Sequence, residues 1–486
     1  MVQFIPNGLN IARFVKEHPP VNIKGFKEDK MAHIMHLIYL IPANNKDLNC
    51  IDGFVPLYSK LLKKRVHNYR LYLDYLCENK ILETDNTYAI NWKSKGYRFA
   101  EQYRVGVNTY NITDTLLVRS IKKARREKFR SVDGYEYLTK WFNENLQIDY
   151  KAAIEFANEE YRLKKAYPEL RDFDVKNDKY KDPYTQYTSN IHNIERVKMQ
   201  DFYMSVDGNV HRFHSNLTCK KSIYRNLLTY NGQNLVSIDI KNSQPYLSLI
   251  LLSKNFWFSK KFDAVISKYF KIYDNFDTTT FNLYNTNRNL YNYIFETRTD
   301  INSYFMCLKR VKMPINKDVA KFVGFVTKGR FYEELAEAIK EETGEEIVDR
   351  KTLKAVVFLV LFTDNRFLGQ EKAEPKRIFK KLFPNMYDLF AATKKKDSTL
   401  LPRILQSVES HLMLNIIAKR ISRERPDLPI FTIHDSIATT VGNEDYVQKV
   451  IRQELTRYIG HQPSLSVEYW KPENMVHKSV PKENAA

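Results

Sequence analysis

Two aspartates, far apart in the chain, each stand where the sequence predicts the end of a buried strand. Asp239 follows the apolar and β-branched run 234–238, and a polar break after it leads into an apolar run that can begin a helix. Asp435 lies between the apolar segments 428–433 and 437–441, which predict a hairpin with the acid at its tip. A carboxylate in such surroundings is costly to desolvate unless it is paired or holds a cation. We therefore expect Asp239 and Asp435 to meet on one sheet and to hold metal ions.

Residues 349–362 predict a helix with two cations and two aromatic rings on one face. This face consists of Arg350, Lys354, Phe358 and Phe362. Because a step of four residues drifts only about 40° around a helix, all four side chains share one broad face. Such a face suits a nucleoside triphosphate, with the phosphates against the cations and the base near a ring. The alternative is an amphipathic core helix that begins with basic residues.

Two further segments carry polar and charged residues that are candidates for contacts with a ligand. Residues 207–225 alternate hydrogen-bonding side chains with cations, as in a loop that follows phosphates. The candidate contacts in this loop are Arg212, His214, Asn216, Lys220, Lys221 and Arg225. Residues 401–420 predict a helix that begins at Pro402, with the polar Gln406 and Glu409 among apolar positions.

The order of these segments resembles the palm and fingers of the family A DNA polymerases and of their relatives, the single-subunit RNA polymerases. Residues 236–249 resemble the first aspartate motif of the family, and 433–436 resemble the second. The cation-led helix is similar to the fingers helix that grips the incoming nucleotide. Residues 212–217 resemble the template–primer segment, and Gln406 stands where the family has a glutamine that touches the minor groove of the primer–template. The resemblance covers separate short segments between roughly residues 200 and 460.

The resemblance implies a metal site and a phosphate site. Asp239, Asp435 and the main-chain carbonyl of Ile240 would hold two Mg²⁺ ions, for which Mn²⁺ can substitute. One ion would lower the pKa of the primer 3′-hydroxyl, and the other would neutralise the triphosphate and the leaving pyrophosphate. Lys354 and Arg350 would bind the phosphates, with Lys354 as a candidate proton donor to pyrophosphate.

The resemblance also implies contacts to the base, the sugar and the primer. Phe358 would stack near the base or sugar, Phe362 would lie beside the templating position, and His434 would contact the terminal phosphate of the primer. Either Gln244 or Tyr246 can occupy the position of the family's glutamate that screens the sugar 2′-hydroxyl, so the choice between deoxyribonucleotides and ribonucleotides stays open. The first 200 residues lack an acidic Asp-x-Glu strand, so we expect no 3′→5′ exonuclease.

Composition indicates a polyanionic partner. The 486 residues carry a formal net charge of +20, and 32 tyrosines and 29 phenylalanines suit base stacking as well as ordinary cores. A basic balance that only aids solubility is the alternative. The four cysteines stand far apart, which indicates neither a zinc site nor a disulfide framework. With no leader pattern and no run of 18 apolar residues, we expect a cytoplasmic protein of a bacterial or phage-infected cell, without a membrane partner and favoured as a monomer.

The predicted fold class is α/β (α+β), a right-hand polymerase with a palm sheet and helical fingers and thumb. The expected parts are a winged-helix-like domain at 1–110, a helical thumb-like or linker region at 111–185, palm at 186–254, fingers at 255–400 and palm again at 401–486. In the first part, helices precede two short strands at 81–84 and 87–91, and a small packing domain without a ligand is equally compatible. The basic run 119–130 is typical of a solvated helix face, and phosphate binding is its other interpretation.

These observations together predict a template-directed nucleotidyl transferase. The first interpretation is a DNA-dependent DNA polymerase that uses a DNA template–primer and nucleoside triphosphates. The alternatives are a non-catalytic DNA-binding replication initiator or regulator with a polymerase-like body, and a single-subunit RNA polymerase or primase-like enzyme.

Overall fold

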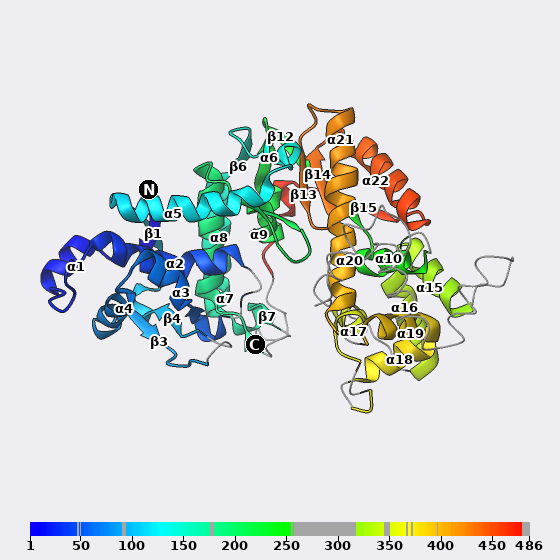
Figure 1. The fold of residues 1–486 in the computed structure, drawn as a ribbon, viewed down its shortest axis with the longest axis horizontal. Coiled ribbons are helices and arrows are strands. Elements are labelled where there is room, and N and C mark those ends of the chain that lie inside the picture. Colours follow the sequence, from blue (N-terminus) through cyan, green and yellow to red (C-terminus); the bar gives the residue numbers. More distant parts are fainter. Residues whose placement is uncertain are drawn as a thin grey trace, which may run out of the picture. The chain divides into compact units, whose positions relative to one another are not determined.

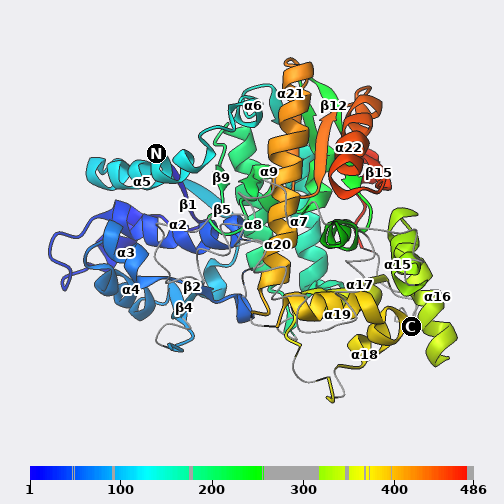
Figure 2. The same ribbon diagram turned by 45° about the vertical axis from the view of Figure 1, so that its right-hand side comes forward.

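The computed structural model describes residues 1–45, 48, 50–89, 94–174, 179–253, 256, 317–344, 350–365, 368–370, 373–395 and 397–478. Its contacts divide this mixed α/β chain into two compact units (Figures 1 and 2). Unit 1 comprises Met1–Ser205, His214–Leu235 and Tyr469–Ala486, and unit 2 comprises Val206–Phe213 and Val236–Glu468. The five-part division expected from the sequence stays a prediction, and much of its fingers part, 257–316, lies outside the described residues.

Unit 1 combines helices with short antiparallel ribbons. Its helices are α1 (Ile11–Glu17), α2 (Glu28–Asn44), α3 (Ser59–Arg65), α4 (Tyr69–Glu78), α5 (Thr115–Phe129), α6 (Glu136–Thr139), α7 (Tyr150–Ala166), α8 (Pro183–Lys198) and α9 (Asn216–Cys219). Its strands are β1 (Val2–Pro6), β2 (Val55–Pro56), β3 (Leu82–Thr84), β4 (Gly96–Phe99), β5 (Val107–Asn111), β6 (Leu146–Ile148), β7 (Phe173–Asp174), β8 (Lys179–Tyr180) and β11 (Leu228–Tyr230). Strand β1 pairs antiparallel with β5, from Val2 opposite Asn111 to Pro6 opposite Val107.

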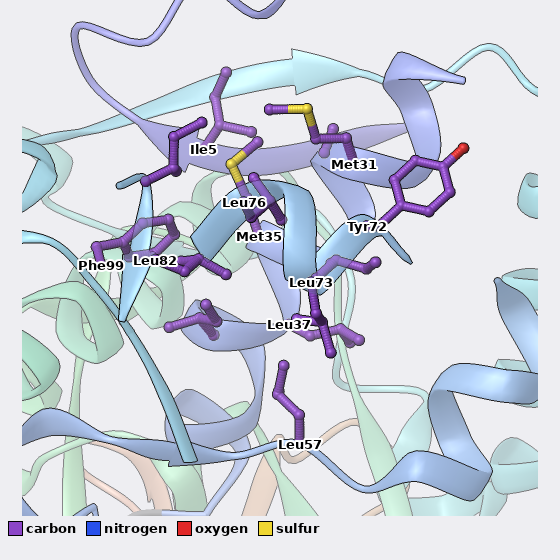
Figure 3. Close-up of a cluster of buried hydrophobic side chains, with 14 of the residues drawn as sticks. Ile5, Met31, Met35, Leu37, Leu57, Tyr72, Leu73, Leu76, Leu82 and Phe99 are labelled. Atoms are coloured by element: carbon purple, nitrogen blue, oxygen red, sulfur yellow. The ribbon is translucent and has the colours of Figure 1, made fainter. Parts of the chain in front are cut away.

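The core of unit 1 is built by α2 and α4 with the strands around them. Met31 and Met35 of α2 and Leu73 and Leu76 of α4 are buried together, as Figure 3 shows. Their spacing of three or four residues puts each pair on one face of its helix. The cluster between these faces is completed by Ile5, Leu57, Tyr72, Leu82 and Phe99.

The predicted order of two helices followed by a hairpin is present as α3, α4, β3 and β4. Strand β3 pairs with β4 at 96–99. Residues 90 and 91 of the predicted strand 87–91 lie outside the described residues. The Asp85 carboxylate accepts hydrogen bonds from the main-chain N–H groups of Thr87 (3.1 Å) and Gly96 (2.8 Å) and so joins the two ends of the segment between β3 and β4. A side chain at Gly96 would approach Asp85 Oδ2 to 2.8 Å. A winged-helix domain is not shown and stays a prediction.

The C-terminal segment returns to unit 1. The Trp470 N–H donates to the Leu235 carbonyl at 2.9 Å, and the indole is buried with 2% exposure. The Lys471 N–H donates to Asn226 Oδ1 at 3.2 Å. Residues more than 200 positions apart in sequence therefore complete the same unit.

Three buried histidines lie in unit 1 beside arginines. The rings of His36 and His192 are 5.6 Å apart, and the His36 Nδ1 accepts from the Phe4 N–H at 3.0 Å. Burial, together with the charges of Arg196 and Arg65, lowers the pKa of His36 to about 3. Burial also lowers the pKa values of His33 and His192. We infer that all three histidines are neutral in the folded unit.

Acidification is expected to destabilise unit 1. A histidine whose folded pKa is depressed contributes stability that is complete above its unfolded pKa of 6.5 and is lost as the pH falls toward the folded pKa of about 3. At pH 5 one such group costs about 2 kcal/mol. Neither ring nitrogen of His192 has a hydrogen-bond partner among the described residues. His192→Leu should therefore flatten the pH dependence of the unfolding free energy, measured by urea unfolding between pH 5 and 8, and an unchanged slope would contradict the prediction.

Unit 2 packs helices against a small sheet. Its helices are α10 (Ser243–Ser248), α15 (Lys317–Thr327), α16 (Phe331–Thr343), α17 (Arg350–Phe362), α18 (Glu374–Leu382), α19 (Pro384–Thr393), α20 (Leu400–Ser410), the π-helical segment η9 (His411–Ala418), α21 (Lys419–Glu424) and α22 (Glu444–Ile459). The strands wholly inside it are β13 (Ile430–Ile433) and β14 (Ser436–Thr440). The strands β9 (Met204–Val206), β10 (Phe213–Ser215), β12 (Gln233–Ile240) and β15 (Leu465–Tyr469) each have residues in both units.

The sheet of unit 2 runs in the order β13–β14–β12, and β15 also pairs with β12. Segments α20, η9 and α21 follow one another without a break and are coloured orange in Figure 2. Segment η9 packs against β13, β14 and α22, while α20 packs against α10 and α17. The predicted helix at 401–420 is thus confirmed, with a π-helical stretch that the apolar pattern did not indicate.

Candidate active site

The strand, break and helix expected around Asp239 are confirmed. Strand β12 buries Leu235, Val236 and Ile238 and ends at Ile240, one residue beyond the partly buried Asp239. The break is a left-handed backbone conformation at Asn242, with φ of +54°, and α10 begins at the next residue. Asparagine adopts this conformation more readily than most residues, which explains the sharp change of direction.

The predicted hairpin around Asp435 is also present. Strands β13 and β14 pair antiparallel, with Ile433 opposite Ser436, and the two-residue turn between them is His434–Asp435. His434 has φ of +55°, as tight hairpin turns require. Asp435 therefore stands at the tip, partly buried.

Asp435 has neighbours from three other segments of unit 2. Burial raises the pKa of the Asp435 carboxyl, while the nearby Ser243 side chain, its own main-chain N–H and the charges of Arg212 and Lys354 lower it, although the Ser243 hydroxyl has no hydrogen-bond partner of ordinary geometry among the described residues. Ser243 follows the end of β12 by three residues, and β12 pairs with β14. The end of β12 and the β13–β14 turn therefore lie at the same edge of the sheet. Asp239 and Asp435 both belong to this edge.

A buried carboxyl at Glu409 ties three of these segments together. Glu409 is 2% exposed and accepts two hydrogen bonds of 2.9 Å from the Arg212 guanidinium, through Nε and one terminal nitrogen. It also accepts a hydrogen bond of 2.7 Å from Gln244 Nε2. Burial raises the pKa of Glu409 to about 8, and the nearby Asp435 adds to this, although Arg212 and Gln244 oppose it. Sequence patterns identify Glu409 only as a polar residue, although an acid on the apolar face of a helix is a signal of burial.

The Asp207 loop presents Arg212 to Glu409. The Asp207 carboxylate accepts from the main-chain N–H groups of Asn209 and Val210, both at 2.8 Å, and from that of Arg212 at 2.7 Å. These bonds close a tight loop in which the main-chain N–H of Asp207 also donates to the Arg212 carbonyl at 3.1 Å. Arg212 is thus held by its own loop at the main chain and by Glu409 at the guanidinium.

Helix α17 confirms the predicted helix at 349–362 and exposes its cation-and-ring face. Lys354 is exposed, Phe358 is 45% exposed, and the Phe358 and Phe362 rings stack with centroids 5.0 Å apart. The Lys354 Nζ lies 6.0 Å from the centroid of the Tyr332 ring. Leu353, Val356, Val357, Val360 and Leu361 are buried on the other side of the helix. The Arg350 side chain lies outside the described residues.

Several residues expected to contact nucleic acid have structural roles. Lys220 is 1% exposed, its Nζ donates to the Asn193 carbonyl at 3.2 Å, and burial lowers its pKa to about 7. Asn216 is equally buried, and its Oδ1 accepts from the Tyr203 N–H at 2.6 Å. Alternating polar and cationic residues also arise where side chains satisfy main-chain groups in a core, and the contacts of Lys220 and Asn216 to nucleic acid stay predictions.

The other predicted contacts of this loop are only partly engaged in interactions inside the protein. Lys221 forms an ion pair with Glu160, and the Arg225 Nε donates to the Leu217 carbonyl at 3.2 Å. His214 is partly buried and belongs to unit 1. Of the six predicted contacts in this loop, Arg212 alone belongs to unit 2, where the two aspartates are.

Of the two candidates for the sugar-screening position, the structure favours Gln244. Tyr246 is completely buried, and its hydroxyl donates to the His461 carbonyl at 2.6 Å, so its side chain is part of the core. Gln244 is partly buried and bonded to Glu409. Gln406 and His434 are both partly buried in unit 2, and their contacts to nucleic acid stay predictions.

The residues at this edge fit a hard divalent cation such as Mg²⁺. Carboxylate and carbonyl oxygens are its preferred ligands, and Asp239, Asp435 and the Ile240 carbonyl supply them. The Asn242 amide and the Gln244 Oε1 are buried without a hydrogen-bond partner among the described residues, as a site for a polar ligand would have them. Within these residues no group of three or more His, Cys, Asp or Glu side chains is placed to hold a metal. The expected site relies on two carboxylates and a main-chain carbonyl.

Comparisons with known proteins give distant structural likenesses only. No protein-family model matches the chain, and no curated protein matches it. Among solved structures it is similar to the polymerase domain of Pol1 from M. smegmatis in complex with DNA primer-template and dNTP, at 11% identity, over 74% of each chain and with a TM-score of 0.28. So low a score is too distant to establish a fold or an activity. In the described part of the chain, no helix has the length and apolar character needed to cross a membrane.

Proposed function

We propose that the chain is a template-directed nucleotidyl transferase that extends a DNA primer on a DNA template. The observation that carries this proposal is the common edge of β12 and the β13–β14 turn, where Asp435 has Ser243, Arg212 and Lys354 as neighbours. An acidic side chain that lies beside cationic side chains at the edge of a sheet is typical of sites that bind phosphates and metal ions.

Each residue then has a role that its surroundings support. Asp239, Asp435 and the Ile240 carbonyl would hold two Mg²⁺ ions, which supply a lowered pKa for the primer 3′-hydroxyl and charge neutralisation at the triphosphate. The exposed Lys354 would bind the phosphates and can donate a proton to the leaving pyrophosphate. Phe358, which is also exposed, would offer its ring to the base or sugar.

The decisive experiment is primer extension on a defined template with Mg²⁺. We expect templated incorporation of deoxyribonucleotides, and parallel reactions with ribonucleotides test the selectivity at Gln244. Failure to incorporate either nucleotide, by protein that still binds the primer–template, would favour the non-catalytic replication initiator.

Lys354→Ala is expected to weaken the use of nucleotides. Removing an exposed ammonium from the phosphate-binding face should raise KM for the nucleotide about tenfold or more, because a charge-assisted hydrogen bond contributes roughly 1.5–3 kcal/mol. Steady-state extension at varied nucleotide concentration measures this effect. Lys380→Ala is the matched control, because Lys380 is also exposed in unit 2 and its Nζ lies 5.4 Å from the Tyr387 ring centroid. If Lys354→Ala impaired only DNA binding, the role assigned to α17 would be wrong.

A further inference from the structure

Helix α5 of unit 1 carries cations on two sides, and one set is used for packing. The Arg125 guanidinium pairs with Asp201 and donates to the Phe202 carbonyl at 2.8 Å. The Lys128 Nζ lies 5.7 Å from the centroid of the Tyr203 ring. These two cations hold the helix against the segment at 201–203.

The cations on the other side of α5 do not hold the helix against another segment among the described residues. They are Arg119, Lys122, Lys123, Arg126 and Arg130, all exposed. In the part of the chain that the structure describes, none of the five forms an ion pair. They line an open groove of about 810 Å³, and Glu127 is the one acid among the lining residues. Five positive charges against one negative charge leave the groove with a net charge of +4.

The apolar side of α5 is already covered by the protein. Leu117 and Ile121 are buried and pack with Ile112 in a small cluster of their own. A helix that lies on a membrane inserts its apolar face into the lipid, and here that face is occupied. Leu116, at 67% exposure, is a single apolar residue and no substitute for such a face.

The spacing of the five cations suits a duplex. They recur at steps of three or four residues, so they share one face of the helix and extend over about 16 Å. A DNA duplex presents about ten phosphates over that length. No aromatic side chain is among the described residues that line the groove, whereas sites for single strands stack bases on aromatic rings.

We propose that this groove on α5 binds the phosphate backbone of duplex nucleic acid, without reading its sequence. The contact goes beyond the proposed function, because it belongs to unit 1 and holds whether or not the chain extends primers. Binding of this kind releases counterions, so the logarithm of the affinity falls by about 0.9 per phosphate contacted for each unit of log salt concentration.

The test compares two variants of the full chain that lose the same charge. The groove variant is Arg119→Gln, Lys122→Gln, Lys123→Gln and Arg126→Gln. The control variant replaces four exposed, scattered lysines of unit 1 with glutamine: Lys16, Lys24, Lys80 and Lys151. Fluorescence anisotropy with a labelled duplex of random sequence is measured from 50 to 300 mM salt, and circular dichroism checks that both variants fold.

We expect the groove variant to bind the duplex about tenfold or more weakly at 0.1 M salt and to lose about three units of salt slope, while the control stays close to the unsubstituted protein. Equal behaviour of the two variants would overturn the proposal. So would a defect confined to single-stranded DNA, or a defect in binding to phosphatidylserine vesicles without one on duplex DNA. Loss of duplex binding that leaves primer extension at saturating DNA intact would support the groove while separating it from the active site.

Discussion

Asp435→Ala is expected to lower the rate of primer extension by several orders of magnitude, and Asp239→Ala should do the same. Both acids belong to the sheet edge where β12 and the β13–β14 turn come together. If they hold the metal ions, loss of either carboxylate removes the charge that keeps the ions in place, and the 3′-hydroxyl regains its ordinary pKa. The measurement is single-turnover extension with Mg²⁺ and saturating primer–template.

The controls separate chemistry from folding and from DNA binding. Asp427 is an exposed aspartate of the same unit, eight residues before Asp435, and Asp427→Ala should leave extension unchanged. Anisotropy should show that the Asp239 and Asp435 variants bind primer–template much as the unsubstituted protein does. Undiminished extension by Asp239→Ala would refute the assignment of the metal site.

Glu409→Ala is expected to reduce both stability and extension. The substitution leaves the Arg212 guanidinium and the Gln244 amide without their shared acceptor, in a region where Glu409 itself is 2% exposed. Removing one partner of a buried hydrogen-bonded pair leaves the other unsatisfied, which costs about 3 kcal/mol when the remaining group is charged. Extension should fall as well, because Arg212 and Gln244 would no longer be held in position. Urea unfolding and extension rates measure the two effects.

A double-mutant cycle identifies the source of that loss. Arg212→Ala combined with Glu409→Ala should cost clearly less than the sum of the single variants, with a coupling free energy of about 2 kcal/mol.

The stability that Glu409 contributes also depends on pH. Because the pKa of Glu409 is raised from 4.5 to about 8, its proton favours the folded state, and this contribution decreases as the pH rises from about 4.5 to about 8. Additive single effects, with no change in the pH dependence of stability, would argue against the pairing.

The sequence predicted the local elements of the site because their signals are local. The end of β12, the break at Asn242 and the β13–β14 hairpin follow from apolar runs interrupted by polar residues. The exposed face of α17 follows from helical periodicity. Each of these patterns is contained in a short, continuous stretch of sequence.

The same local patterns could not predict contacts between residues that are far apart in the sequence. Arg212 and Glu409 are 197 residues apart, and nothing near either residue reveals its partner. Lys220 was mistaken for a surface cation because a basic residue in a polar stretch looks the same whether water or a main-chain carbonyl satisfies it. The pairing of β3 with the strand at 96–99 was not predicted, because the hydrogen bond from the Gly96 N–H to the Asp85 side chain joins residues 11 positions apart.

The division of the chain into interleaved segments has a consequence for its synthesis. Trp470 donates to Leu235 and is buried in unit 1, so that unit cannot acquire this contact until residue 470 has left the ribosome. Domains ordinarily fold one after another from the N-terminus during translation. Here the earlier unit must wait for the later one, and a nascent chain halted before residue 470 would hold an incomplete first unit.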